Sequence, residues 1–205
     1  MKIKVCGMRE AGNIREVAAL GPDFMGFIFY PRSPRYVGED FVLPEVAEGI
    51  RKTGVFVNAP VEHVLRLARQ YGLDYVQLHG DETQEYGAVL KDAGLKILKA
   101  FAVDASFELE SLKAFEEVAD YFLLDTKGDG YGGQGRPFDW NILKDYKAKT
   151  PFLVAGGISN DNIQELLKLD HPLFYGIDVN SRYEISPGLK DVGQLREAFL
   201  RVSSR

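Results

Sequence analysis

Eight short runs of mainly hydrophobic residues recur along the chain, separated by stretches in which the apolar positions are spaced differently. The runs are rich in β-branched and aromatic residues, and Gly, Pro, Asn or Asp stands at many of their borders, as is typical of β-strands. They cover residues 2–6, 23–29, 53–58, 74–79, 95–103, 120–126, 151–156 and 173–179. This pattern predicts eight strands.

The stretches between the runs have helical spacing. Apolar residues recur at intervals of three and four in two of them: Val61, Val64, Leu65 and Ala68, and then Ile163, Leu166 and Leu167. We expect Pro60 in the first turn of the first helix and Ser159 or Asn160 as the cap of the second. A strand followed by a helix, eight times over, predicts parallel strands joined by right-handed crossovers.

Such crossovers build either an open doubly wound sheet or a closed barrel. The chain has 205 residues, 45% of them hydrophobic and 27% charged, which suits one compact domain. Because no second domain or hydrophobic tail is visible, eight units favour closure. We therefore predict an α/β fold, a single (β/α)8 TIM barrel over residues 1–205, with short loops because the chain is small for this architecture.

Charge and cysteine content exclude several classes of protein. A net charge of -5 argues against generic nucleic-acid binding, which depends on Lys and Arg. One cysteine cannot form an internal disulfide framework or a multi-cysteine metal site. The first ten residues lack the apolar run of a secretory signal, and no stretch approaches the roughly 20 apolar residues that span a bilayer. We expect a cytoplasmic protein without nucleic-acid or membrane partners.

In a closed barrel the chemistry lies at the C-terminal ends of the strands. Cys6 ends the first run, and the alternation of a strand places Lys4 and Cys6 on the same side of it. A neighbouring ammonium group favours the thiolate over the thiol, so Cys6 is a candidate base or nucleophile. The alternative is a small, inert core residue.

Asp125 ends the sixth run and is a candidate general acid, provided that burial raises its pKa. The alternative is an aspartate that caps the following turn. The loop after it holds five glycines from Gly128 to Gly135 and lacks the GK[ST] ending of a nucleotide P-loop. We expect either a lid that closes over a small substrate or an ordinary surface loop.

Two loops suit an anion. AGGIS at 155–159 follows the seventh run and DVNSRYE at 178–184 follows the eighth. The backbone at Gly156 and Gly157 can approach an oxyanion closely, and a helix N-terminus after it would add positive charge. Loops at these positions of a barrel often bind phosphate, so we predict a phosphate site here, with a simple turn as the alternative.

Other strand ends carry further candidates. Arg32 and Arg35 follow the second run, and an arginine fork matches a carboxylate or phosphate, Arg35 being the stronger candidate. His79 is the only histidine at a strand end, and it either contacts substrate or serves a structural hydrogen bond. The three histidines show no metal-like spacing, so no metal is expected.

Several motifs follow one another in order over the whole chain: KVCGM (4–8), GFIFYPRSPRYV (26–37), GVFVN (54–58), VQLHGDE (76–82), LLDT with YGGQGRPFDW, AGGIS and PGLKD (187–191). Together they resemble phosphoribosylanthranilate isomerase of tryptophan biosynthesis. The resemblance implies a cofactor-free (β/α)8 enzyme at the third step from chorismate to tryptophan. It would convert the small molecule N-(5-phosphoribosyl)anthranilate to 1-(2-carboxyphenylamino)-1-deoxyribulose 5-phosphate, an Amadori rearrangement of the aldose–ketose isomerase type.

The resemblance also implies roles for individual residues. Cys6 would be the general base, Asp125 the general acid, and Arg35 the partner of the anthranilate carboxylate. The phosphate would be held by Gly156, Gly157, Asn180 and Ser181, with Lys4, His79 and Asp178 as other substrate contacts. DVNSRYE replaces the commoner DVSSGVE of the family, which leaves open whether Asn180, Ser181 or Arg182 contacts phosphate.

Two other classes remain open at this stage. A ribulose-phosphate epimerase or an aldolase would share the phosphate loops but would need a metal cluster or a Schiff-base lysine, for which Lys99 is the only tempting residue. A non-catalytic barrel that binds phosphate is the third possibility.

Overall fold

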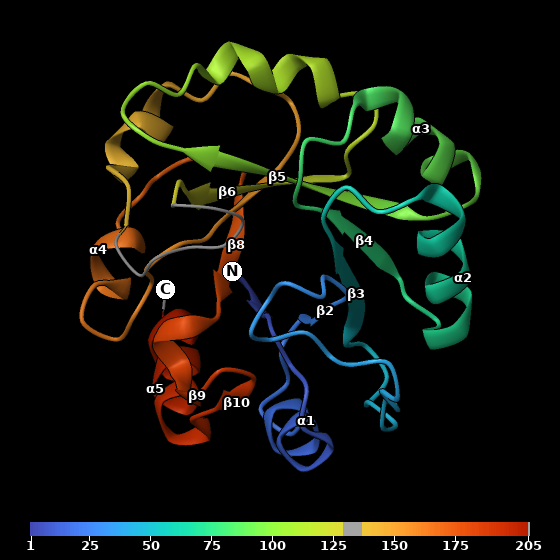
Figure 1. Ribbon diagram of the computed structural model, residues 1–205. Coiled ribbons are helices and arrows are strands. Elements are labelled where there is room, and N and C mark those ends of the chain that lie inside the picture. The colour runs from blue at the N-terminus through green and yellow to red at the C-terminus, as the bar shows by residue number, and fades with distance from the viewer. Residues whose placement is uncertain (129–136, 205) are drawn as a thin grey trace.

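Eight parallel strands close into a ring in the computed structural model, which describes residues 1–128 and 137–204 (Figure 1). The ring follows chain order, and β1 pairs with both β2 and β8, which closes it. The strands are β1 Lys2–Val5, β2 Phe24–Ile28, β3 Arg51–Phe56, β4 Tyr75–Leu78, β5 Lys96–Val103, β6 Tyr121–Thr126, β7 Phe152–Val154 and β8 Phe174–Val179. Every predicted run overlaps one of these strands, and the ends differ by two residues at most, so the predicted barrel is confirmed.

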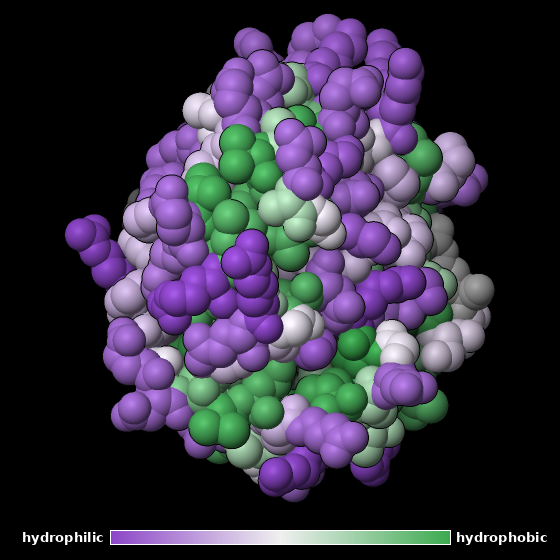
Figure 2. Space-filling model, turned by 90° about the vertical axis from the view of Figure 1, so that its right-hand side faces the viewer, coloured by the Kyte–Doolittle hydropathy of each residue, from purple (hydrophilic) through white to green (hydrophobic). Residues whose placement is uncertain are grey.

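Helices surround the ring (Figure 1). The α-helices are α1 Ala11–Ala18, α2 Val61–Tyr71, α3 Gln84–Asp92, α4 Ile163–Leu166 and α5 Val192–Ser203, and the 3₁₀ helices are η1 Leu109–Phe115, η2 Trp140–Asp145 and η3 Ser181–Tyr183. In α2, Val64, Leu67 and Ala68 are buried against the strands. The outer face of the molecule on the side of α2 and α3 is covered mostly by hydrophilic side chains, with hydrophobic patches between them (Figure 2).

The expected helix after every strand is wrong at one place. Residues 29–50, all of which the structure describes, connect β2 to β3 by turns and extended chain without a helix. Proline lacks the N–H that an interior helical residue donates, and this segment holds three: Pro31, Pro34 and Pro44. Gly38 and Gly49 adopt positive φ of 95° and 92°, which also interrupts helical geometry.

The expected helix starts also need correction. Pro60 lies directly before α2 at the capping position, not in the first turn. In α4 the residue before the helix is Asn162, so neither Ser159 nor Asn160 caps it. The side chain of Asn160 instead donates to the main-chain oxygen of Gln194 in α5, at 3.1 Å, and so joins the turn before α4 to α5.

The strand residues divide between two cores. Ile3 and Val5 of β1 belong to the large core between strands and helices, whereas Cys6 packs inside the barrel with Ile28 and Val55. A second inner cluster holds Leu98, Ala100, Leu123, Leu153 and Ala155. The predicted alternation along β1 is therefore confirmed.

Aromatic rings fill the barrel at the N-terminal ends of its strands. The ring of Phe24 meets that of Tyr75 edge to face at 5.3 Å between centroids, and Tyr121 stacks on Tyr175 at 4.5 Å. The guanidinium of Arg51 lies over Phe24 at 4.9 Å from the ring centroid. This end of the barrel is thus packed shut, and open space is left to the other end.

A small antiparallel hairpin, β9 Glu184–Ser186 and β10 Leu189–Lys190, follows η3 and was not predicted. It lies beside α1 and α5 (Figure 1). The side chain of Asn13 in α1 accepts from the main-chain N–H of Lys190 at 2.7 Å and donates to its carbonyl oxygen at 2.9 Å. Within the described part of the chain, no helix is long and apolar enough to cross a membrane.

Candidate active site

The C-terminal ends of the strands enclose a cavity of about 240 Å³. All the predicted site residues except Lys4 line it: Cys6, Arg35, His79, Asp125, Gly156, Gly157, Asp178, Asn180 and Ser181. Arg182 lines it as well, whereas Arg32 is exposed outside it. The barrel therefore brings residues that are far apart in the sequence into one cavity. Cys6 and Ser181, for example, are 175 positions apart.

Lys4 lies beneath the cavity and not on its wall, which revises the expected substrate contact. Its side chain is fully buried, and its Nζ donates to Oδ2 of Asp178 at 2.9 Å. Burial lowers the pKa of Lys4, but the negative charge of Asp178 and the proximity of Cys6 outweigh that effect and leave the pKa above its ordinary value. Lys4 is thus a permanent cation below Cys6 and acts on the site through its two neighbours.

Cys6 stands at the end of β1 with its thiol facing the cavity. Gly26 of β2 makes room for it, because a Cβ at Gly26 would lie 2.6 Å from Cys6 Sγ. Burial raises the pKa of the Cys6 thiol, while the ammonium groups of Lys4 and Lys190 pull the pKa down. The expected influence of Lys4 is present, yet burial outweighs it and the net pKa is above the ordinary value.

Asp125 stands at the end of β6. Burial, and then the negative charge of Asp178, raises the pKa of Asp125 to about 7. Its Oδ1 is buried and has no hydrogen-bond partner among the described residues. Gly156 packs directly on it, since a Cβ at Gly156 would lie 2.6 Å from this oxygen. A carboxyl group with this pKa is partly protonated at neutral pH.

His79, at the end of β4, faces the same carboxyl group. Its Nε2 lies 3.6 Å from Asp125 Oδ2, and its Nδ1 is hydrogen-bonded to Gln77 Nε2 at 2.7 Å. Burial lowers the pKa of His79 to about 4, with the charges of Lys4 and Lys99 acting in the same direction. The imidazole is therefore neutral, and the tautomer that fits an amide nitrogen of Gln77 at Nδ1 carries its proton on Nε2, on the side of Asp125.

The loop that carries His79 is fastened by a buried network that the sequence did not reveal. Glu82 accepts from the main-chain N–H groups of Asn58 at 2.8 Å and Gly80 at 2.9 Å, and it pairs with Lys99 Nζ at 3.1 Å. Lys99 also donates to the carbonyl oxygen of Gly80 at 2.6 Å. Lys99 thus points away from the lumen and does not line the cavity, which removes the basis for a Schiff-base role.

Arg35 reaches the cavity from the loop after β2. Its Nε and Nη2 donate to the carboxylate of Glu184 at 2.7–2.9 Å, and Lys190 Nζ donates to the same carboxylate at 2.7 Å. Sequence reasoning missed Glu184 and Lys190. Both lie within motifs that it singled out, DVNSRYE and PGLKD, but only the hairpin brings them to Arg35.

The predicted phosphate end is formed by the loops after β7 and β8. Gly156 and Gly157 adopt φ of 84° and 67°, a conformation that glycine reaches without strain. Asn180 accepts from Lys190 Nζ at 2.6 Å through Oδ1, which leaves its amide N–H groups as donors toward an anion. The expected helix N-terminus is not there, because α4 has four residues and begins only at Ile163.

The expected lid falls almost wholly outside the described residues, which include Gly128 but not positions 129–136. In the part of the chain that is described, no group of three or more His, Cys, Asp or Glu side chains could hold a metal ion.

Known proteins provide an independent comparison. The family model for N-(5'-phosphoribosyl)anthranilate isomerase matches residues 3–201. The chain is 48% identical to the N-(5'-phosphoribosyl)anthranilate isomerase of Parabacteroides distasonis over 206 residues, covering 98% of this chain and 93% of that protein. It is also 48% identical to that of Phocaeicola vulgatus over 192 residues, covering 93% and 92%.

Solved structures agree with these relatives. The phosphoribosyl anthranilate isomerase of Thermotoga maritima superimposes with a TM-score of 0.87 at 28% identity over 100% of both chains. A structure of such an isomerase in complex with reduced 1-(o-carboxyphenylamino)-1-deoxyribulose 5-phosphate gives a TM-score of 0.84 at 26% identity, again over 100% of both chains.

Proposed function

This chain belongs to the N-(5'-phosphoribosyl)anthranilate isomerase family, and on that premise we propose that Cys6 and Asp125 are the general base and general acid of its reaction. The chain is an aldose–ketose isomerase of tryptophan biosynthesis that forms 1-(2-carboxyphenylamino)-1-deoxyribulose 5-phosphate. The observation that carries the proposed roles is that both side chains line one cavity while the pKa of Asp125 is raised to about 7.

Asp125 opens the sugar ring in this proposal. The protonated carboxyl group gives its proton to the furanose ring oxygen, the bond from that oxygen to C1 breaks, and the nitrogen lone pair forms an iminium ion at C1. A raised pKa suits this step because a substantial fraction of the acid is still protonated at neutral pH. His79 is proposed to stabilise the carboxylate that remains, since its Nε2 lies 3.6 Å from Asp125 Oδ2.

Cys6 completes the isomerisation. Its thiolate removes the proton from C2, the electron pair of that C–H bond forms the C1–C2 double bond, and the iminium nitrogen becomes neutral. The resulting enolamine tautomerises to the aminoketone product. In the reactive form of the enzyme, Cys6 is a thiolate and Asp125 is protonated. The alternative form, in which Cys6 is a thiol and Asp125 is ionised, has the same number of protons and differs only in where one of them lies. The ammonium groups of Lys4 and Lys190 lower the pKa of the Cys6 thiol and so favour its thiolate.

Binding groups lie on either side of the acid and base. Arg35 is proposed to hold the anthranilate carboxylate, and the main chain at Gly156 and Gly157, with Asn180 and Ser181, to hold the phosphate. Their support is that all of them line the cavity and that arginine and glycine-rich main chain suit these anions. Asp178, held by Lys4, remains a proposed contact of the substrate, its Oδ1 being buried without a partner among the described residues.

We place the protein in the cytoplasm with this small-molecule substrate as its partner. The free thiol of Cys6 supports a reducing compartment. No organic cofactor enters the proposed steps, since the iminium ion formed from the substrate itself accepts the electron pair.

The test is the loss of anthranilate-derived fluorescence when purified protein acts on N-(5-phosphoribosyl)anthranilate. Cys6→Ala and Asp125→Asn should each lower kcat by about 10² to 10⁴, the usual contribution of a general base or acid. Arg32→Ala, in the exposed part of the Arg35 loop, is the control and should retain wild-type kcat. Wild-type turnover by either site variant would refute the role of that residue.

A further inference from the structure

The hairpin β9–β10 supplies a buried carboxylate that binds two cations at once. The side chain of Glu184 is 4% exposed and that of Lys190 is not exposed at all, while Arg35 keeps 19% of its side-chain surface. Glu184 also accepts from the N–H of Gly188, at 3.1 Å, in the turn of the hairpin. Of these three charged groups, only Arg35 lines the cavity.

The way in which Glu184 binds Arg35 determines what the guanidinium can still do. Glu184 occupies the edge formed by Nε and Nη2, and Nη1 has no partner among the described residues. A guanidinium has a second edge, Nη1 with the remaining hydrogen of Nη2, which suits a second carboxylate. The pairing therefore fixes the plane of the group and leaves one edge for a ligand in the cavity.

Charge also favours an anion at this place. One carboxylate pairs here with two cations, so the cluster carries one surplus positive charge, and arginine is the member with access to the cavity. Lys190 also links this cluster to the loop after β8, because its Nζ donates to Asn180 Oδ1 at 2.6 Å. Gly7, next to Cys6, is closely packed between the two ends of this network: a Cβ there would lie 2.7 Å from Asn180 Oδ1 and 2.8 Å from Arg35 Cδ.

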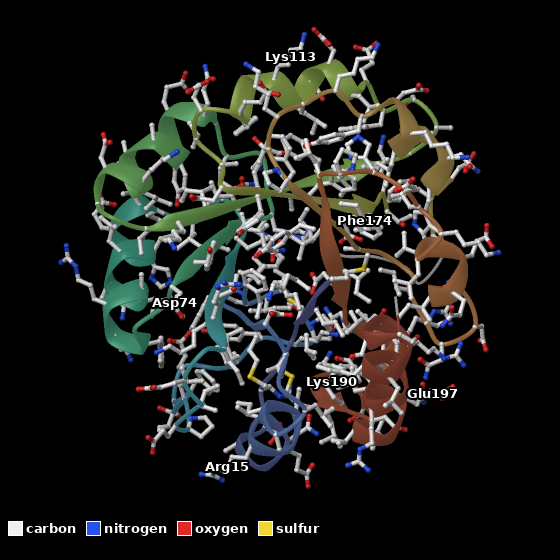
Figure 3. The ribbon with its side chains drawn as sticks, turned by 180° about the vertical axis from the view of Figure 1, so that it is seen from behind. Arg15, Asp74, Lys113, Phe174, Lys190 and Glu197 are labelled. Atoms are coloured by element: carbon white, nitrogen blue, oxygen red, sulfur yellow. The ribbon has the colours of Figure 1, made fainter. Side chains whose placement is uncertain are left out.

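The hairpin itself is held in place by α1. Asn13 of α1 binds both main-chain polar groups of Lys190, and these atoms are buried. In Figure 3, Lys190 lies between α1 and α5. Rigid support of this kind is what a binding group needs to keep its orientation before the ligand arrives.

We propose that Glu184, held in turn by Lys190, is a positioning residue that presets Arg35 for the carboxylate of the substrate. This inference rests on the proposed role of Arg35. It assigns the hairpin a function in substrate discrimination: the enzyme recognises an aminoaldose phosphate that carries an aromatic carboxylate over one that lacks it, and it does so through a residue that does not touch the substrate.

The test compares two substrates, N-(5-phosphoribosyl)anthranilate and N-(5-phosphoribosyl)aniline, which lacks the carboxylate. Glu184→Gln should raise KM for the first substrate by roughly tenfold to a hundredfold, the range of a charge-assisted hydrogen bond, with kcat within about twofold. Both constants for the aniline compound should stay within about twofold of wild type. The control is Glu197→Gln, which removes a carboxylate that pairs with Arg201 on the outer surface of α5 (Figure 3). It should leave KM and kcat unchanged for both substrates.

Two further variants separate the possible failures. Arg35→Met should abolish the preference for the carboxylated substrate, and Arg35→Met combined with Glu184→Gln should be no worse than Arg35→Met alone. If Glu184→Gln does not fold, Glu184→Asp keeps the charge but is shorter by one methylene and should give an intermediate loss of preference.

Equal losses for both substrates in a folded Glu184 variant, or no loss for either, would overturn the positioning role while leaving the role of Arg35 intact. An unchanged preference in Arg35→Met would instead refute the proposed role of Arg35 and, with it, this inference.

Discussion

The role proposed for Asp125 opposes the stability of the fold. Its ordinary pKa of 3.8 is raised to about 7, chiefly because the carboxylate is buried. The folded state therefore binds this proton more tightly than the unfolded state. The stabilisation that goes with the proton is fully present below about pH 4 and is lost as the pH rises through about 7.

Asp125→Asn should consequently be more stable than wild type at neutral pH although its kcat is expected to be lower. The rise in pKa corresponds to about 4 kcal/mol at most, at about 1.4 kcal/mol per pKa unit. The difference in free energy of unfolding between variant and wild type should grow by about 2 to 3 kcal/mol from pH 5 to pH 8. Urea denaturation at both pH values measures it, and a difference that stays constant would contradict the assigned pKa.

Gly26 illustrates how a missing side chain can serve catalysis. Gly26→Ala would place a methyl group 2.6 Å from Cys6 Sγ and 3.1 Å from Cys6 Cα, so the thiol must move. We expect kcat to fall about tenfold to a hundredfold, because small misplacements of a catalytic group are costly, with a loss of stability of about 1–3 kcal/mol.

Gly12→Ala is the matched control for that substitution. A Cβ at Gly12, in α1, meets no atom within 4 Å, and alanine favours the helix, so this variant should be slightly more stable with unchanged kcat. Equal kinetics for the two alanine variants would show that the thiol needs no such space.

Among the elements, the loop after β4 depends on residues from two neighbouring strands. Asn58 follows β3, Lys99 lies in β5, and both meet Glu82 beside His79. The side chains of Glu82 and Lys99 are 2% and 4% exposed. Each buried charge is therefore compensated by the other, and removal of one would leave the other without a counter-ion.

Lys99→Met should therefore destabilise the protein by about 3–5 kcal/mol, the usual effect of removing one partner of a buried ion pair. It should also lower turnover, because Gly80 and the adjacent His79 lose a fixed support. Lys113→Met removes the partner of Glu110 in an exposed pair and should leave stability unchanged within error. Chemical denaturation of the two variants checks this, and similar midpoints would contradict the importance of the buried network.

The same elements show what the sequence could and could not predict. The eight strands were found because each is a short hydrophobic run between turn residues, a pattern set by neighbours in the chain. Cys6, Asp125 and the glycines of AGGIS stood out because they directly follow such runs. Glu184 and Lys190 did not, because their partner Arg35 is about 150 residues away and only the tertiary fold brings them together. The raised pKa of Cys6 was missed for a related reason: the depth of burial that outweighs Lys4 is a property of the closed barrel.

On the scale of the whole molecule, stability and function are assigned to opposite ends of the barrel. Phe24 is 1% exposed at the N-terminal end, in contact with the rings of Tyr75 and Tyr121 and under Arg51. The cavity with Cys6 and Asp125 lies at the C-terminal end. Substitutions at one end should therefore leave the other largely unaffected.

Phe24→Ala tests that separation. Loss of this ring should cost about 3–5 kcal/mol of stability, as for other buried aromatic residues. Well below the melting temperature, kcat/KM should remain within about twofold of wild type. Thermal melts together with kinetics at low temperature give both quantities, and a tenfold loss of kcat/KM in folded protein would show that the two ends are coupled.

The pairing of β1 with β8 has a consequence for the synthesis of the protein. Lys4 and its counter-ion Asp178 are separated by 174 positions, so the lysine leaves the ribosome early and waits for its partner through most of translation. Glu184 and Lys190 arrive later still. A nascent chain that ends before residue 178 contains both Cys6 and Asp125, yet it has no closed ring to hold them. The ring, and the cavity at its end, can therefore be completed only after β8 has docked against β1, late in the synthesis of these residues.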